Sequence, residues 1–116
     1  MIRLSIRVDL DPAGRLGPGK IELLEQVAKS GSIAAAGRAM GMSYRRAWEL
    51  IDDVNALFRE PLVTKQSGGN SGGGAALTPL GRKLVAKYRA IERDAHRAAL
   101  PHLRALQKSV RAKAAS

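Results

Sequence analysis

The chain has 116 residues, of which 45% are hydrophobic and only 3% aromatic, and its formal net charge is +10. This length supports one compact domain, whose core must rest on aliphatic side chains. The absence of cysteine excludes disulfides and thiolate metal sites, and two histidines are too few for a closed zinc site. No apolar run approaches the roughly 20 residues of a membrane span, and no secretion signal is visible. We therefore expect a soluble, cytoplasmic protein without a cofactor.

The positive charge is concentrated in the last third of the chain. Residues 1–78 contain 10 Lys or Arg and 8 Asp or Glu, a balance of +2, whereas residues 79–116 contain 10 and 2, a balance of +8. Such an excess predicts a polyanionic partner, most often nucleic acid.

The first expected elements are a strand and a helix. Apolar and polar residues alternate over residues 2–10, which predicts a half-buried strand. The turn-rich segment DPAGRLGPG follows and leads into a helix at about residues 20–29, with an apolar stripe at helical spacing. No other strand is predicted nearby, so we expect residues 2–10 to pair with a later hairpin or with a second chain.

Two further helices are predicted around Gly41. Ser32 is placed as the N-cap of a helix over residues 33–40, which ends at Gly41, a residue type that accepts positive φ. Ser43 then caps a longer helix that reaches about Arg59, because Pro61 prevents its continuation. Two short helices joined by a turn of three or four residues are typical of a helix-turn-helix.

The C-terminal half predicts a hairpin and a long helix. Residues 62–66 and 75–78 are strand-like on either side of SGGNSGGG, and Pro79 opens a helix in which Pro101 is expected to cause a kink or a restart. We therefore predict a mostly α fold with a small β component, a winged helix-turn-helix with an N-terminal strand and a long C-terminal helix. The predicted domain covers residues 1–107, followed by a basic flexible tail at 108–116.

The third predicted helix carries the candidate DNA-reading residues. One face is apolar, and the other presents Arg45, Arg46 and Glu49 in the first two turns. In a helix-turn-helix these turns enter the major groove, where an arginine can bind guanine bidentately and a glutamate can accept from cytosine. An ordinary helical hairpin with solvated arginines is the alternative. The full set of predicted DNA contacts is Ser32, Ser43, Tyr44, Arg45, Arg46, Glu49, Lys65, Gly68, Gly69 and Arg82.

The glycine loop is predicted to be a wing tip. Gly74 is followed by Ala-Ala-Leu, so the Lys-Ser/Thr of a phosphate-binding loop is missing. Gly68, Gly69 and nearby Lys65 are assigned to DNA phosphates or a groove, although a loop without any contact is an equal alternative. Trp48 is expected to pack at the edge of the core. No catalytic set of residues is found, and we expect no enzyme activity.

The segment GKIELLEQVAKSGSIAAAGRAMGMSYRRAWELIDDVN, together with GGGAALTPLG, resembles the N-terminal domain of the molybdate-responsive ModE regulators. More broadly, residues 18–92 are similar to the winged helix-turn-helix of LysR-type regulators. The resemblance implies a homodimeric DNA-binding domain with the helix from Ser43 as recognition helix. ModE-type regulators continue into C-terminal oxyanion-binding domains. Because the chain ends at Ser116 in a basic tail, we expect no such sensor and do not carry molybdate binding over.

Three functions are weighed. The first is a sequence-specific transcriptional regulator that binds duplex DNA, and the others are a nonspecific architectural DNA-binding protein and a protein-interaction module. A homodimer is expected because the last helix repeats apolar residues at alternating spacings of four and three. The predicted dimer contacts are Ile21, Leu24, Leu84, Tyr88, Ile91 and Ala95.

Overall fold

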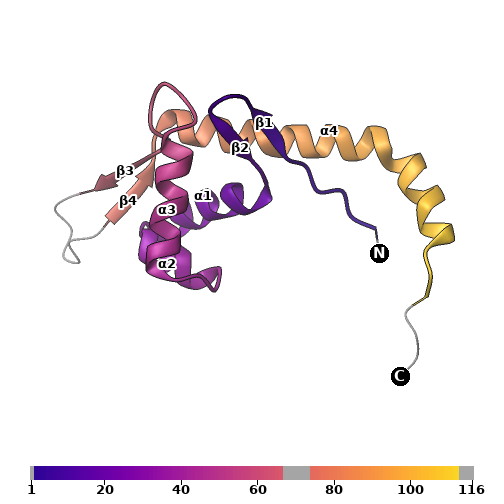
Figure 1. The fold of residues 1–116 in the computed structure, drawn as a ribbon, viewed down its shortest axis with the longest axis horizontal. Helices are drawn as coiled ribbons and strands as arrows, with labels where there is room; N and C mark the ends of the chain where they lie inside the picture. The colour runs from indigo at the N-terminus through magenta and orange to yellow at the C-terminus, as the bar shows by residue number, and fades with distance from the viewer. Residues whose placement is uncertain (1, 67–73, 113–116) are drawn as a thin grey trace.

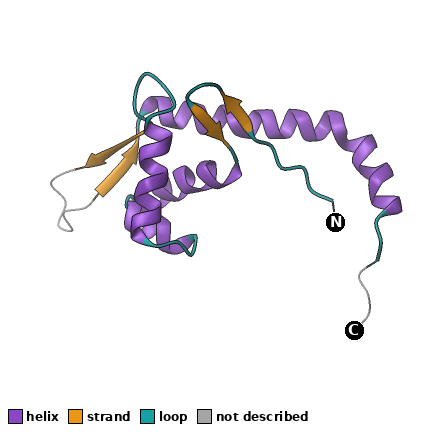
Figure 2. Cartoon of the chain, viewed as in Figure 1, coloured by secondary structure: helices purple, strands orange, loops and turns teal. Residues whose placement is uncertain are grey.

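The computed structural model describes residues 2–66 and 74–112. Four helices and two small antiparallel sheets follow one another in the order β1, β2, α1, α2, α3, β3, β4, α4 (Figures 1 and 2). The predicted mostly α architecture is confirmed. Figure 1 shows the hairpin β3–β4 on one side of α3 and the hairpin β1–β2 on the other.

The N-terminal hairpin corrects the prediction for residues 2–10. Only Val8–Leu10 form a strand (β1), and its partner is Gly14–Leu16 (β2), with Val8 opposite Leu16. The expectation that residues 2–10 have no partner nearby in sequence is therefore wrong, and β1 does not pair with the later hairpin. The two strands are joined by a tight loop at the start of the turn-rich segment. A hydrogen bond of 2.7 Å from the Ala13 N–H to the Leu10 carbonyl closes this loop.

The three central helices form the compact part of the molecule. They are α1 (Pro18–Ser30), α2 (Ile33–Ala39) and α3 (Tyr44–Asn55). Gly41 has the expected positive φ, 69°, in the turn between α2 and α3. The third helix ends earlier than predicted, at Asn55 rather than about Arg59, because its C-terminus is tied to the following strand, as described below.

The second hairpin and the last helix follow as predicted in type. Val63–Gln66 (β3) pairs with Gly74–Leu77 (β4), so Gly74 belongs to the strand rather than to the predicted loop, and residues 67–73 lie outside the described residues. The helix α4 runs over Pro79–Ser109, past the predicted domain boundary at residue 107. It contains Pro101 without a restart, and Figure 1 shows it changing direction toward its C-terminal end. Within residues 2–66 and 74–112, no helix is both long and apolar enough to span a membrane.

The core lies between α1, α2, α3, the second hairpin and the first turns of α4. Ile21, Leu24 and Tyr88 have no exposed surface, since each is packed inside this chain. Their predicted contribution to a dimer contact is therefore corrected: they stabilise the single chain. The remaining buried hydrophobic residues are Leu16, Leu23, Val27, Ile33, Ala36, Ala47, Ile51, Val54, Leu57, Leu62, Val63, Ala75 and Leu77.

Candidate nucleic-acid interface

The start of α3 is set by Ser43. Its Oγ accepts a hydrogen bond of 3.1 Å from the backbone N–H of Arg46, which makes Ser43 the N-cap, as predicted. With the helix starting at Tyr44, the side chains of Ala47, Ile51 and Val54 are buried. The opposite face is in solvent: the side chain of Arg45 is 91% exposed. A basic surface is thus presented by the first turns of α3.

Glu49 joins the two arginines of this surface. Its Oε1 lies 3.4 Å from Arg45 Nε, and its Oε2 lies 3.3 Å from an Nη atom of Arg46. One carboxylate therefore orients two guanidinium groups. Exposed pairs of this kind contribute little to stability and are weakened by salt, so the arginines can leave the carboxylate at small cost.

The helix α2 packs closely on α3. Ser32 caps α2 through a hydrogen bond of 3.1 Å from the Ala35 N–H. A Cβ on Gly37 would lie 2.9 Å from the Cβ of Ala47, so only glycine fits where the two helices meet. Because Ser32 and Ser43 accept hydrogen bonds as caps, each hydroxyl can still donate its proton to a phosphate oxygen.

The second hairpin contacts α3 through Lys65 and Trp48. Lys65 Nζ lies 4.6 Å from the centroid of the Trp48 ring, and the Tyr44 ring meets the same indole edge to face at 6.1 Å. Trp48 is half-buried, in keeping with its predicted packing role. The sequence assigned Lys65 to phosphate without this contact. Cation–π pairs at exposed sites contribute about 0.5–1 kcal/mol, so this contact helps to hold the hairpin against α3.

Two polar residues that sequence reasoning missed fix the base of this hairpin. Asn55 Oδ1 accepts hydrogen bonds of 2.8 Å from the Leu62 N–H and 3.0 Å from the Val63 N–H. Thr78 caps α4 by accepting from the Gly81 N–H at 2.9 Å, and its hydroxyl donates to the Pro61 carbonyl at 2.8 Å. The Thr-Pro pair at the start of a helix was a visible signal for Thr78. Nothing local marked Asn55.

Arg82 and the glycines complete the predicted contacts. Arg82 is exposed on the first turn of α4, and one of its Nη atoms donates to the Leu77 carbonyl at 3.0 Å. This holds the guanidinium beside the end of β4. Gly68 and Gly69 lie outside the described residues. The structure thus brings Tyr44, Arg45, Arg46 and Glu49 together on α3, while Ser32, Lys65 and Arg82 lie on neighbouring elements.

Not every cation of the chain belongs to this surface. Arg89 on α4 donates from Nε to a carboxylate oxygen of Glu25 on α1 at 3.1 Å. The pKa of Arg89 is raised above its usual value, most strongly by its hydrogen bonds to Glu25 and next by its hydrogen bond to Glu92. Arg89 therefore joins α1 to α4, and it is not one of the predicted DNA-binding residues.

Comparison with known proteins finds one family and several relatives. The family described as bacterial regulatory helix-turn-helix protein, lysR family, matches residues 19–82. The molybdenum-pterin-binding protein MopB of Rhodobacter capsulatus is 47% identical over 78 residues, which are 67% of this chain and 29% of that protein. The molybdenum transport protein ModE of Azotobacter vinelandii is 44% identical over 92 residues, 79% of this chain and 33% of that protein.

The chain therefore spans about a third of the length of these curated relatives. Among solved structures, a chain in the crystal structure of a CbnR_DBD–DNA complex matches with a TM-score of 0.60 and 20% identity, covering 76% of this chain and 95% of that one. At this identity, the likeness concerns the fold alone.

Proposed function

Because the chain belongs to the LysR family of bacterial regulatory helix-turn-helix proteins, we propose that it is a sequence-specific regulator of transcription that binds duplex DNA. The observation that carries this proposal is the exposed surface of Tyr44, Arg45 and Arg46 on the first turn of α3, opposite a fully packed face. Helix-turn-helix proteins place this turn in the major groove. The site of action is the bacterial chromosome, hence the cytoplasm, and we propose no enzymatic activity.

Each predicted contact takes a role from its position. Arg45 or Arg46 binds guanine O6 and N7, and Glu49 accepts from a cytosine amino group once the arginines have moved onto the bases. Lys65 on β3 and Arg82 on the first turn of α4 bind phosphates and fix the orientation of α3. The balance of +8 over residues 79–116 adds a long-range attraction to DNA that depends on salt.

Selection from a random duplex library tests the proposal. We expect one enriched motif, because specific binders exceed their nonspecific affinity by about 10³-fold or more. Arg46→Ala should relax the preference at one base position by about 1–3 kcal/mol. Arg59→Ala, an exposed arginine beyond the end of α3, is the matched control and should keep the preference. Binding without an enriched motif would favour an architectural protein, and failure to bind DNA at low salt would favour a protein-interaction module.

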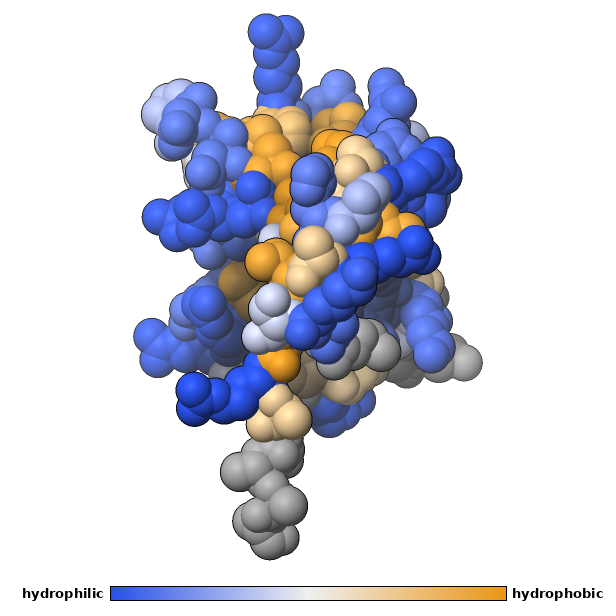
Figure 3. All heavy atoms as spheres, turned by 90° about the vertical axis from the view of Figure 1, so that its right-hand side faces the viewer, coloured by the Kyte–Doolittle hydropathy of each residue, from blue (hydrophilic) through white to orange (hydrophobic). Residues whose placement is uncertain are grey.

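We further propose a homodimer formed through α4. Ile91 is 45% exposed and Leu106 60%, whereas most apolar residues of the first turns pack on the core. Figure 3, which faces the end of the molecule where α4 projects, shows apolar residues between hydrophilic ones on that surface. Of the predicted contacts, Ile91 is exposed, whereas Leu84 and Ala95 are partly buried within the chain and offer only their remaining surface to this interface. A two-fold axis predicts a palindromic DNA site with half-sites about 34–36 Å apart.

Sedimentation at micromolar concentration tests the dimer. Ile91→Glu should convert the wild-type dimer into a monomer, because it places a charge in the apolar contact. Ala86→Glu adds the same charge on an exposed position of α4 that points elsewhere, and it should leave the dimer intact. A wild-type species near the chain mass of 12.4 kDa would contradict the proposal.

A further inference from the structure

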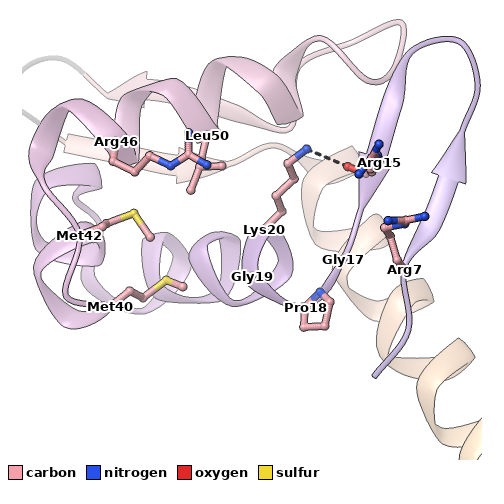
Figure 4. Close-up of a pocket in the computed structure, with 10 residues that line it drawn as sticks. All are labelled: Arg7, Arg15, Gly17, Pro18, Gly19, Lys20, Met40, Met42, Arg46 and Leu50. Carbon is pink, nitrogen blue, oxygen red and sulfur yellow. Dashed lines mark hydrogen bonds between the residues drawn. The ribbon is translucent and has the colours of Figure 1, made fainter. Parts of the chain in front are cut away.

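A cavity of about 370 Å³ lies on the side of α3 that faces the N-terminal hairpin (Figure 4). Its walls come from β2, the first turn of α1, the turn between α2 and α3, and α3 itself. Part of this wall, including Arg7 and Arg15, precedes the residues that match the family. The cavity is therefore built partly from the N-terminal hairpin of this chain.

The floor of the cavity is apolar. Met40, Met42 and Leu50 line it, and each is only partly buried by the rest of the chain. Figure 4 shows the two thioether side chains extending into the space from the turn between α2 and α3. Methionine side chains adapt to irregular apolar ligands because they are unbranched and polarizable. The chain thus leaves an apolar surface uncovered at the bottom of a hollow.

The rim of the cavity is cationic. Arg7, Arg15, Lys20 and Arg46 line it. Two of these cations form ion pairs with carboxylates, since Arg7 lies 3.0 Å from Asp9 and Arg46 lies 3.3 Å from Glu49. The Lys20 side chain donates to the Arg15 carbonyl at 2.9 Å. Within the described parts of the chain, the side chains of Lys20 and Arg15 form no ion pair. The rim keeps a positive balance.

The first turn of α1 adds to this field. Its N-cap, Gly17, provides no side-chain hydrogen bond, and no acidic residue stands in the first turn. The positive end of the helix dipole therefore opens toward the same space.

From the apolar floor and the cationic rim together, we propose that the cavity binds a small organic anion with an apolar body, and that the bound anion competes with DNA for Arg46. An inorganic oxyanion would leave the methionine floor without a partner, and a purely apolar ligand would leave the rim unused. The volume suits a ligand of one or two rings, because ligand pockets measure roughly 300–1,000 Å³.

The competition with DNA follows from the shared residue and rests on the proposed function. Arg46 lines the cavity and also lies on the surface assigned to base contacts. A carboxylate in the cavity attracts the guanidinium away from the bases, so the anion should weaken DNA binding. By linkage, DNA weakens the binding of the anion by the same factor.

The methionines provide the direct test, without DNA. The chain has three methionines, so ¹³C-methyl labelling gives three NMR signals, of which those of Met40 and Met42 report on the cavity. We expect 2-naphthoate to shift the signals of Met40 and Met42 in a saturable way. The neutral 2-naphthalenemethanol should bind about tenfold more weakly, which corresponds to about 1.4 kcal/mol. Inorganic phosphate alone should leave both methyl signals in place.

Variants separate the cavity from general charge effects. Arg15→Gln should weaken 2-naphthoate binding severalfold, and Arg59→Gln, an exposed arginine that does not line the cavity, should not. Equal binding of the neutral analogue, a missing methyl shift, or an equal effect of phosphate would overturn the proposal.

Fluorescence anisotropy of a labelled duplex tests the second half. With the motif selected above, 2-naphthoate at its binding concentration should lower DNA affinity in the wild type but much less in Arg15→Gln. Methyl shifts without any effect on DNA would confirm the anion site and refute the competition. If the chain binds no DNA at all, the methyl titration still decides whether the anion site exists, so the two failures are distinguishable.

Discussion

The first and last turns of α4 carry similar apolar residues at helical spacing, but only the first turns are buried. Tyr88 has no exposed surface, whereas Leu106, five turns later on the same helix, is 60% exposed. The difference does not come from the sequence of the helix itself. It comes from what lies opposite: the first turns meet α1, β4 and the N-terminal segment, and the last turns extend beyond the domain (Figure 1).

Long-range contacts hold the first turns in place. The Tyr88 hydroxyl donates to the Ile6 carbonyl, and Arg89 pairs with Glu25 on α1. A Cβ on Gly81 would clash with the Leu62 carbonyl oxygen, so this part of α4 packs directly on the Leu62 backbone. The molecule is elongated: its radius of gyration is 17.2 Å, whereas that of a compact 100-residue domain is roughly 13 Å. An apolar stripe alone therefore does not say whether a helix is part of the core.

Tyr88→Ala is expected to produce the largest effect. Loss of a fully buried aromatic ring should lower the free energy of unfolding by about 3–5 kcal/mol. Leu106→Ala, on the exposed part of the same helix, should change it by about 0.5 kcal/mol or less. Urea denaturation at a concentration below any self-association measures both. Similar losses in the two variants would show that the last turns are also packed within one chain.

Substitutions of two glycines by alanine should have smaller effects on stability, and the two effects should have opposite signs. Gly81→Ala should destabilise by about 1–3 kcal/mol, because the new methyl group forces α4 away from the Leu62 backbone. Gly19→Ala, in the first turn of α1, should stabilise by about 0.4–1 kcal/mol, since nothing lies within 4 Å of its added Cβ and the unfolded chain loses freedom. Thermal or urea unfolding of both variants provides the measurement. A neutral Gly81→Ala would disprove the close contact.

The smallest expected effect is a dependence on alkaline pH. Burial, reinforced by the negative charge of Glu92, raises the pKa of Tyr88 above its ordinary value of 10.0. The folded state thus favours the neutral phenol. This stabilisation is fully present below pH 10.0 and is lost as the pH rises from there through the pKa of the folded protein. In Tyr88→Phe, the free energy of unfolding should fall less between pH 9 and 11 than in the wild type, which alkaline urea titration would show.

The sequence alone determined the elements whose signals are local. Ser32 and Ser43 each act as an N-cap, and Gly41 takes positive φ, because capping and turn formation depend on neighbouring residues. The position of Arg45 and Arg46 on the solvent face of α3 followed from helical spacing for the same reason. These features predicted a helix-turn-helix with an exposed basic face, and the strand-like segments on either side of the glycine loop predicted the wing.

Only the tertiary structure decided which surfaces meet. Residues 8–10 pair with the adjacent strand, Ile21 and Tyr88 belong to the core, and Lys65 lies over Trp48. Periodicity shows that a face is apolar, but burial depends on a partner that is distant in sequence. Asn55 also depends on partners beyond its helix, because its side chain accepts hydrogen bonds from residues 62 and 63. With this contact, α3 ends at Asn55, earlier than Pro61 alone predicted. Long-range packing therefore determined where the elements end and which apolar residues belong to the core, and local patterns did not.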